Sequence, residues 1–164
     1  MDHIWSPWRY QYIASAGREE GCVFCRIEQE HRDAENYLVH RAQLNFVILN
    51  LFPYTSGHLM IVPYQHEASL AAVDQATTAE MIELAKRAQT ALEAEYHPDG
   101  FNIGMNLGRS AGAGVADHLH LHVVPRWSGD ANFVSIVGET RVLPEDLATS
   151  HQKMKKHFDA WENT

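Results

Sequence analysis

The stretch "ADHLHLHVVPRW", residues 116–127, carries histidines at three alternate positions. If this stretch is a β-strand, His118, His120 and His122 share one face, because side chains two residues apart point the same way. The apolar residues between them share the other face. We therefore expect the apolar face to pack on a core and the imidazoles to face a cleft or solvent. Pro125 cannot donate to a strand ladder and is expected to end the strand.

The spacing of the histidines limits what they can do together. An extended backbone advances ~13 Å from His118 to His122, too far for both to bind one ion at bond lengths of ~2.1 Å without bending the strand. Imidazole titrates near neutrality, so each ring can act as a nucleophile, a proton carrier or a metal ligand. A surface strand in a chain with 11 histidines is the alternative. Three alternating histidines after a glycine-rich loop favour a function.

Length and composition indicate one globular domain over residues 1–164, with 45% hydrophobic and 21% charged residues. The net charge is -8, and no Lys/Arg run exceeds the pair at 155–156. A broad basic surface for nucleic acid is therefore not expected. The apolar run "FVILNLF", residues 46–52, is too short to span a bilayer, and the N-terminus lacks a signal pattern. We expect a cytoplasmic protein without membrane or nucleic-acid partners.

The chain pattern predicts an α+β domain around an antiparallel sheet. Residues 1–20 form an aromatic-rich arm, and a half-buried strand is expected where residues alternate at 101–108. Three further β-type runs occupy residues 36–41, 45–50 and 57–63, the last two as a hairpin.

Two helices are predicted. The first begins near Thr77, where Thr77 and Glu80 fit a capping box, and it ends at "HPDG", residues 97–100. The second opens at Pro144 and continues to residue 161. Its apolar spacing is carried by Leu147, His151, Met154, Phe158 and Trp161.

The only two cysteines are Cys22 and Cys25, in "GCVFCRI", residues 21–27. They are too close to staple a fold, and their spacing is typical of a metal or redox pair in a reducing compartment. A redox pair would follow a strand in a βαβ unit, which the pattern does not predict here. Two thiolates supply half of a tetrahedral zinc site, so two more ligands must come from distant histidines or carboxylates. Free buried thiols are the other alternative.

Three blocks resemble the histidine-triad (HIT) superfamily. "HLHLHVV", residues 118–124, resembles its His-x-His-x-His motif, and "NLFPYTSGHLMIVPYQH", residues 50–66, resembles its first block. "FNIGMNLGRSAGAGVADH", residues 101–118, resembles its glycine-rich entry to the triad. The resemblance implies a HIT core over residues 20–130, with a five-stranded antiparallel sheet and a long central helix. A C-terminal helix would follow at residues 144–161.

In this family the central histidine attacks the α-phosphorus of a nucleotide and forms a covalent nucleotidyl-histidine. The resemblance therefore implies that His120 is the nucleophile and that His122 and His58 bind the α-phosphate oxygens. Asn50 would contact ribose, and Asn106 the phosphate or leaving group. By residue type alone, Asn50 could equally enter a turn and Asn106 lie on a solvated face. Backbone N–H groups at Gly112 and Gly114 would approach phosphate.

Zinc-bearing members of the family resemble this chain at the cysteine pair. In them a histidine after the "VP" strand and the first triad histidine complete the site. The resemblance thus implies a structural zinc ion bound by Cys22, Cys25, His66 and His118.

The segments "WSPWRYQYI", residues 5–13, and "VVPRWSGDANF", residues 123–133, resemble the bacterial branch related to diadenosine tetraphosphate phosphorylases. That branch often carries Gly-Ser before the triad, whereas this chain has Ala113 and Gly114. The acceptor could therefore be water or phosphate. Four residues of these segments could shape a dinucleotide cleft or a dimer contact, or could simply pack in the fold: Trp5, Trp8, Arg9 and Trp127.

The resemblance implies a nucleotide hydrolase or phosphorylase acting on an adenine nucleotide, such as a dinucleoside polyphosphate. It also implies a homodimer, with the helix at 77–96 in the interface. Two alternatives stay open: a nucleotide-binding or signalling module with incidental turnover, and a zinc-dependent hydrolase.

Overall fold

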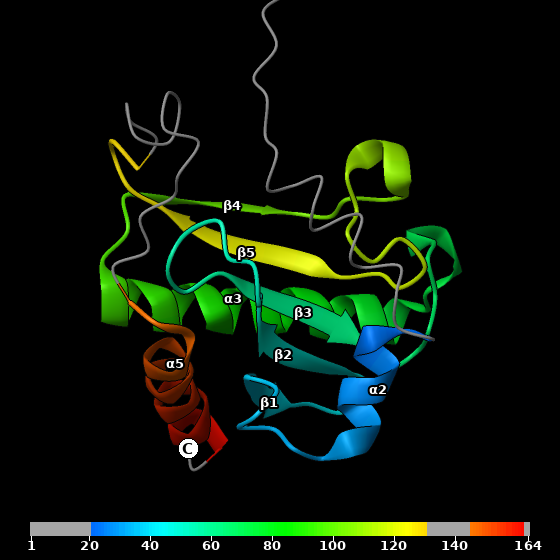
Figure 1. Ribbon diagram of the computed structural model, residues 1–164, viewed down its shortest axis with the longest axis horizontal. Helices are drawn as coiled ribbons and strands as arrows, with labels where there is room; N and C mark the ends of the chain where they lie inside the picture. Colours follow the sequence, from blue (N-terminus) through cyan, green and yellow to red (C-terminus); the bar gives the residue numbers. More distant parts are fainter. Residues whose placement is uncertain (1–20, 131–144, 163–164) are drawn as a thin grey trace, which may run out of the picture.

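The computed structural model describes residues 21–130 and 145–162 (Figure 1). The predicted aromatic arm with Trp5, Trp8 and Arg9 lies outside the described residues, as does Pro144.

Five strands form one antiparallel sheet in the order β1-β2-β3-β5-β4. The α+β class and the five-stranded sheet are thus confirmed. The strands are β1 (Leu38–Arg41), β2 (Asn45–Leu49), β3 (Leu59–Pro63), β4 (Gly100–Gly104) and β5 (Leu121–Arg126). The α-helices are α2 (Val23–Glu30), α3 (Gln75–Tyr96) and α5 (Leu147–Glu162), with short 3₁₀ turns η1 (Leu70–Ala72) and η2 (Arg109–Ala111).

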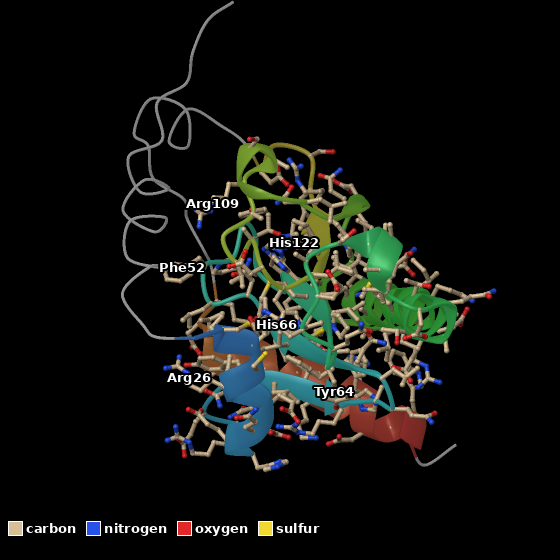
Figure 2. The ribbon with its side chains drawn as sticks, turned by 90° about the vertical axis from the view of Figure 1, so that its right-hand side faces the viewer. Arg26, Phe52, Tyr64, His66, Arg109 and His122 are labelled. Carbon is tan, nitrogen blue, oxygen red and sulfur yellow. The ribbon has the colours of Figure 1, made fainter. Side chains whose placement is uncertain are left out.

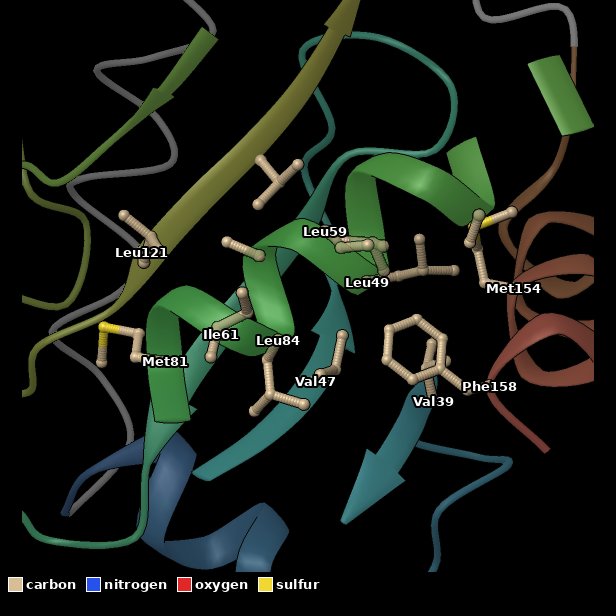
Figure 3. Close-up of a cluster of buried hydrophobic side chains, with 14 of the residues drawn as sticks. Val39, Val47, Leu49, Leu59, Ile61, Met81, Leu84, Leu121, Met154 and Phe158 are labelled. Atoms are coloured by element: carbon tan, nitrogen blue, oxygen red, sulfur yellow. The ribbon is translucent and has the colours of Figure 1, made fainter. Parts of the chain in front are cut away.

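Helices cover both faces of the sheet (Figure 1). The helices α3 and α5 pack on one face, and residues from them and from the strands form the larger core (Figure 3). Met154 and Phe158 of α5 are fully buried there, which confirms the predicted apolar face of this helix. On the opposite face, Phe24 of α2 packs with Phe46 and Met60 in a smaller cluster. Because Met60 pairs with His122 across β3 and β5, His122 points to the α2 face.

The histidine stretch differs from its predicted strand. β5 begins only at Leu121, so His118 and His120 lie in the segment that enters the strand. All three triad histidines are buried, rather than open to solvent. Pro125 does not end the strand. The pairing of β5 with β3 stops at Val123, so no β3 residue lies opposite Pro125 to need its missing N–H, while the pairing with β4 continues through Pro125.

One further prediction was wrong in its bounds. The strand expected at 101–108 stops at Gly104 and forms the edge of the sheet, where Ile103 is about half exposed, as is Leu107 just after the strand. The helix α2 was not predicted. Its apolar residues Val23, Phe24 and Ile27 share one side, but the helix is only eight residues long, so the pattern covers little more than two turns.

The start of α3 also differs from the predicted capping box. Asp74 caps the helix, accepting hydrogen bonds from the backbone N–H and the hydroxyl of Thr77 at 2.9 and 2.7 Å. Glu80 instead accepts hydrogen bonds from the backbone N–H groups of Gln43 and Leu44 at 3.1 and 2.8 Å. It also accepts one from the Asn45 amide at 2.8 Å. Glu80 therefore ties α3 to the turn between β1 and β2.

Replacing Glu80 with glutamine should lower the free energy of unfolding by ~1–3 kcal/mol, because three donors lose a charged acceptor. Chemical denaturation measures the change. The matched control is Glu83→Gln, which removes an exposed ion pair with Lys86 on the same helix and should cost less than ~0.5 kcal/mol. Equal effects of the two changes would contradict this role of Glu80.

Candidate active site and metal centre

The central histidine of the triad has one ring nitrogen fixed by the backbone. Nδ1 of His120 lies 2.9 Å from the carbonyl oxygen of His118. A carbonyl can only accept, so Nδ1 must carry the proton and Nε2 keeps its lone pair. Burial lowers the pKa of His120, which favours the neutral ring. A neutral imidazole with an unprotonated Nε2 is the form that attacks phosphorus.

His58 and His122 form a second hydrogen-bonded unit. The backbone N–H of Tyr54 donates to Nδ1 of His58 at 3.1 Å, so His58 carries its proton on Nε2. That N–H donates to Nδ1 of His122 at 2.9 Å. Nε2 of His122 must then carry the remaining proton. Burial, followed by the charge of His120, lowers the pKa of His122 to about 4, so this ring is a neutral donor at neutral pH.

The three rings lie in one cluster. The ring centroids of His120 and His122 are 4.9 Å apart, and those of His122 and His58 are 5.1 Å apart. The ring of Tyr54 lies against His58 at 4.6 Å. The cluster thus presents one Nε2 lone pair and one Nε2–H donor, which match a nucleophile and a phosphate-oxygen donor.

The predicted nucleotide contacts lie on two loops. Asn50 is buried just after β2, with its Nδ2 3.4 Å from Nδ1 of His58 and its Oδ1 accepting from the backbone of Phe52. Asn106, Gly112 and Gly114 lie, partly buried, in the segment between β4 and β5 that leads into the triad. Gly112 has a φ of 88°, which favours glycine over residues with a side chain.

A group of four side chains next to the triad has the donors of a metal site. The candidate ligand atoms of Cys22, Cys25, His66 and His118 all lie within 4.8 Å of one another. Sγ of Cys22 is 3.2 Å from Nδ1 of His118, and Sγ of Cys25 is 3.3 Å from Nδ1 of His66. Figure 2 shows His66 beside the N-terminal end of α2, where the cysteines lie.

The proton on His118 points away from the sulfur atoms. Its Nε2 lies 2.8 Å from the carbonyl oxygen of Pro63 and must donate to it, which leaves the Nδ1 lone pair facing Cys22 and Cys25. Burial and the neighbouring Cys22 raise the pKa of the Cys25 thiol to about 11 without a cation. A bound divalent cation would favour the thiolate instead. Two thiols and two imidazoles in this arrangement fit tetrahedral zinc.

Two contributors to the site were not predicted. Tyr54 acts through its backbone N–H, for which the identity of the side chain gives no signal. Phe24 packs its ring against both His118 and His120, at centroid distances of 5.4 and 5.3 Å. Phe24 stands between the two cysteines in sequence. Had a helix been predicted over this segment, its apolar side would have placed Phe24 toward the core.

A buried histidine cluster beside a Cys2His2 group, on an antiparallel sheet, defines a histidine-triad site. Residues 31–129 match the HIT domain family, and the chain belongs to this family. It is an enzyme of the histidine-triad type.

The chain is similar to "AP-4-A phosphorylase" of Mycobacterium tuberculosis, with 39% identity over 155 residues that cover 90% of this chain and 79% of the relative. An uncharacterised HIT-like protein of Saccharolobus solfataricus is 32% identical over 69% of this chain and 79% of the relative. Among solved structures, a Zn-bound histidine triad family protein from Mycobacterium smegmatis superposes with a TM-score of 0.71 and 31% identity. That match covers 87% of this chain and 96% of the other. In the described part of this chain, no helix is long and apolar enough to cross a membrane.

Proposed function

We propose that the protein transfers a nucleotidyl group from a dinucleoside polyphosphate through a covalent intermediate on His120. The observation that carries the proposal is the hydrogen bond from Nδ1 of His120 to the His118 carbonyl, which leaves Nε2 free to attack. The similarity to the M. tuberculosis phosphorylase supports the substrate class.

In the first step, Nε2 of His120 forms a bond to the α-phosphorus, and the bond from that phosphorus to the bridging oxygen breaks. The leaving group departs with the remaining phosphates. The ring becomes positively charged, and its Nδ1–H bond to the His118 carbonyl stabilises that charge. Nε2–H of His122, held by His58, donates to a non-bridging oxygen as charge spreads over the phosphoryl group.

The remaining contacts belong to the same proposal. Asn50, beside His58, binds the ribose, and Asn106 contacts the phosphate or leaving group. Backbone N–H groups at Gly112 and Gly114 approach the phosphates. We assign a structural zinc ion to Cys22, Cys25, His66 and His118, where it would hold α2 against the loop that enters the triad.

The second step needs an acceptor, and its products identify it. From diadenosine tetraphosphate, the first step releases ATP and leaves AMP on His120. Attack by phosphate then gives ADP, whereas attack by water gives AMP. We propose phosphate, as the name of the M. tuberculosis relative indicates, although Ala113 and Gly114 stand where the related branch often has Gly-Ser.

Chromatography of the products, with and without inorganic phosphate, tests the proposal. Phosphate-dependent ADP identifies a phosphorylase, and AMP at every phosphate concentration identifies a hydrolase. Turnover below one per hour with measurable nucleotide binding would contradict both and favour a binding or signalling module. A panel that includes adenosine phosphoramidate and adenylyl sulfate would identify another substrate class.

The pH dependence of kcat/KM should show an acidic limb centred below 6.5, the ordinary pKa of histidine. Protonation of His120 occupies the attacking Nε2, and burial lowers the pKa of this ring, so the active neutral form persists to lower pH. The rate should therefore rise with pH through the limb and stay level above pH 7. Circular dichroism at each pH checks that the protein remains folded, and a limb centred above pH 6.5 would contradict the neutral-nucleophile assignment.

We also propose a cytoplasmic homodimer. The apolar residues of α3 that were expected to supply the contact are packed against the chain's own sheet, so α3 offers only outward residues such as Ile82. Ile103 on the β4 edge and Leu107 in the segment after it offer further exposed apolar side chains. Light scattering coupled to size-exclusion chromatography measures the oligomeric state.

A further inference from the structure

The backbone around His118 has few hydrogen bonds from the sheet to hold it. β5 begins at Leu121, so the carbonyl of His118, on which the tautomer of His120 depends, lies outside the strand. The backbone N–H of Leu119 donates to the carbonyl of Glu67 at 2.7 Å. Because this N–H and the His118 carbonyl belong to one planar peptide group, the bond to Glu67 orients the carbonyl, and the contacts of the His118 side chain hold the same residue from its other side.

The His118 side chain is held on three sides. Its Nε2–H donates to the Pro63 carbonyl, and its Nδ1 faces the two cysteine sulfurs at 3.2 and 3.6 Å. Its ring also packs edge-on against Phe24, with an interplanar angle of 77°. One residue thus connects the metal-site cluster to His120 through its backbone carbonyl.

Phe24 makes a second connection between the same two groups. It lies in the first turn of α2, between Cys22 and Cys25, and only 4% of its surface is exposed. Its ring contacts His118 on one side and His120 on another, at 5.4 and 5.3 Å. A movement of α2 at the cysteines would therefore move the ring that packs against His120.

We propose that Phe24 is a positioning residue that couples the Cys2His2 cluster to the nucleophile by keeping Nδ1 of His120 on the His118 carbonyl. A histidine that leaves this carbonyl can carry its proton on Nε2, and the lone pair that attacks phosphorus is then lost. The inference rests on the proposed role of His120. The tautomer of His120 can nevertheless be measured without any substrate.

The test is Phe24→Leu in the full-length, metal-loaded protein. Nitrogen-15 NMR of labelled histidine reports which ring nitrogen of His120 carries the proton, and elemental analysis reports the metal content. We expect full metal content, a new population protonated at Nε2, and a fall in kcat of ~10-fold or more with KM changed less than ~3-fold.

The matched control is Phe46→Leu. Phe46 is fully buried in the same cluster, and among the described residues its ring packs on Phe24 and Tyr64. This change should lower the melting temperature about as much as Phe24→Leu, but leave the His120 nitrogen signals and kcat unchanged. A separate variant, Phe24→Tyr, keeps an aromatic ring at this position and should show the wild-type tautomer of His120.

Unchanged nitrogen signals in Phe24→Leu, or the same change in Phe46→Leu, would overturn the inference. If Phe24→Leu does not fold, Phe24→Met offers a side chain of similar volume that is longer and more adaptable, and it is judged by the same signals. A wild-type protein that forms no nucleotidyl-histidine would instead overturn the proposed function, and the tautomer measurement would still decide the coupling.

Discussion

Replacing His120 with alanine should lower kcat by ~10⁴-fold or more, because no other side chain of the described histidine cluster offers the attacking nitrogen. His122 carries a proton on Nε2, and Nδ1 of His58 already accepts from the Tyr54 N–H, so neither can replace His120 in its present geometry. Nucleotide binding should survive, since His122, His58 and Asn50 remain. Steady-state kinetics measure the loss, and mass spectrometry of rapidly acid-quenched samples should show the nucleotidyl adduct in the wild type and not in the variant.

The matched control for this change is His157→Ala. His157 lies on α5, where its Nε2 is 3.2 Å from Glu95 of α3. Both helices cover the face of the sheet opposite to the His122 side chain, so this change should leave kcat within about twofold of wild type. Wild-type turnover in His120→Ala would exclude the covalent mechanism. It would favour the zinc-dependent hydrolase, in which a metal-bound water attacks.

The alternating histidines predicted part of the site from local geometry alone. Spacing along an extended chain separates His118 from His122, and the structure directs His118 to the cysteines while His122 pairs with His58. The roles assigned to these residues came from the family resemblance, and they remain proposals. No local pattern connects Cys22 with His118, because they are separated by 96 positions in sequence.

Long-range hydrogen bonds explain where local sequence patterns failed. Thr77 and Glu80 satisfy the spacing of a capping box, but Asp74 provides a better cap and Glu80 bonds to the β1–β2 turn. The sequence cannot show this competition, because the donors on that turn lie more than 30 positions away. Likewise, the missing N–H of Pro125 predicts a strand end. Whether that N–H is needed depends on the neighbouring strand, because only a residue paired with Pro125 could accept from it.

Metal removal should chiefly lower stability. A zinc ion at the proposed site would hold the N-terminal end of α2 and the loop at His118 together, and without a cation the pKa of the partly exposed Cys25 thiol is about 11. We expect one zinc per chain, and a fall of ~3 kcal/mol or more in unfolding free energy on chelation, which is ~6–12 °C in melting temperature. Elemental analysis and calorimetry measure these quantities. Cys25→Ser should lower the melting temperature similarly and make it insensitive to chelator.

Asp117→Asn is the matched control for the metal site, since Asp117 is exposed next to His118 and lies outside the four-ligand cluster. It should keep one zinc and the wild-type melting temperature. Chelated protein, assayed below its own melting temperature, should retain reduced turnover, because the attacking nitrogen belongs to His120 and only its positioning is loosened. Complete loss of turnover in a protein that is still folded would contradict a structural zinc. A zinc-bound nucleophile predicts this complete loss, together with a pH profile that changes when cobalt replaces zinc.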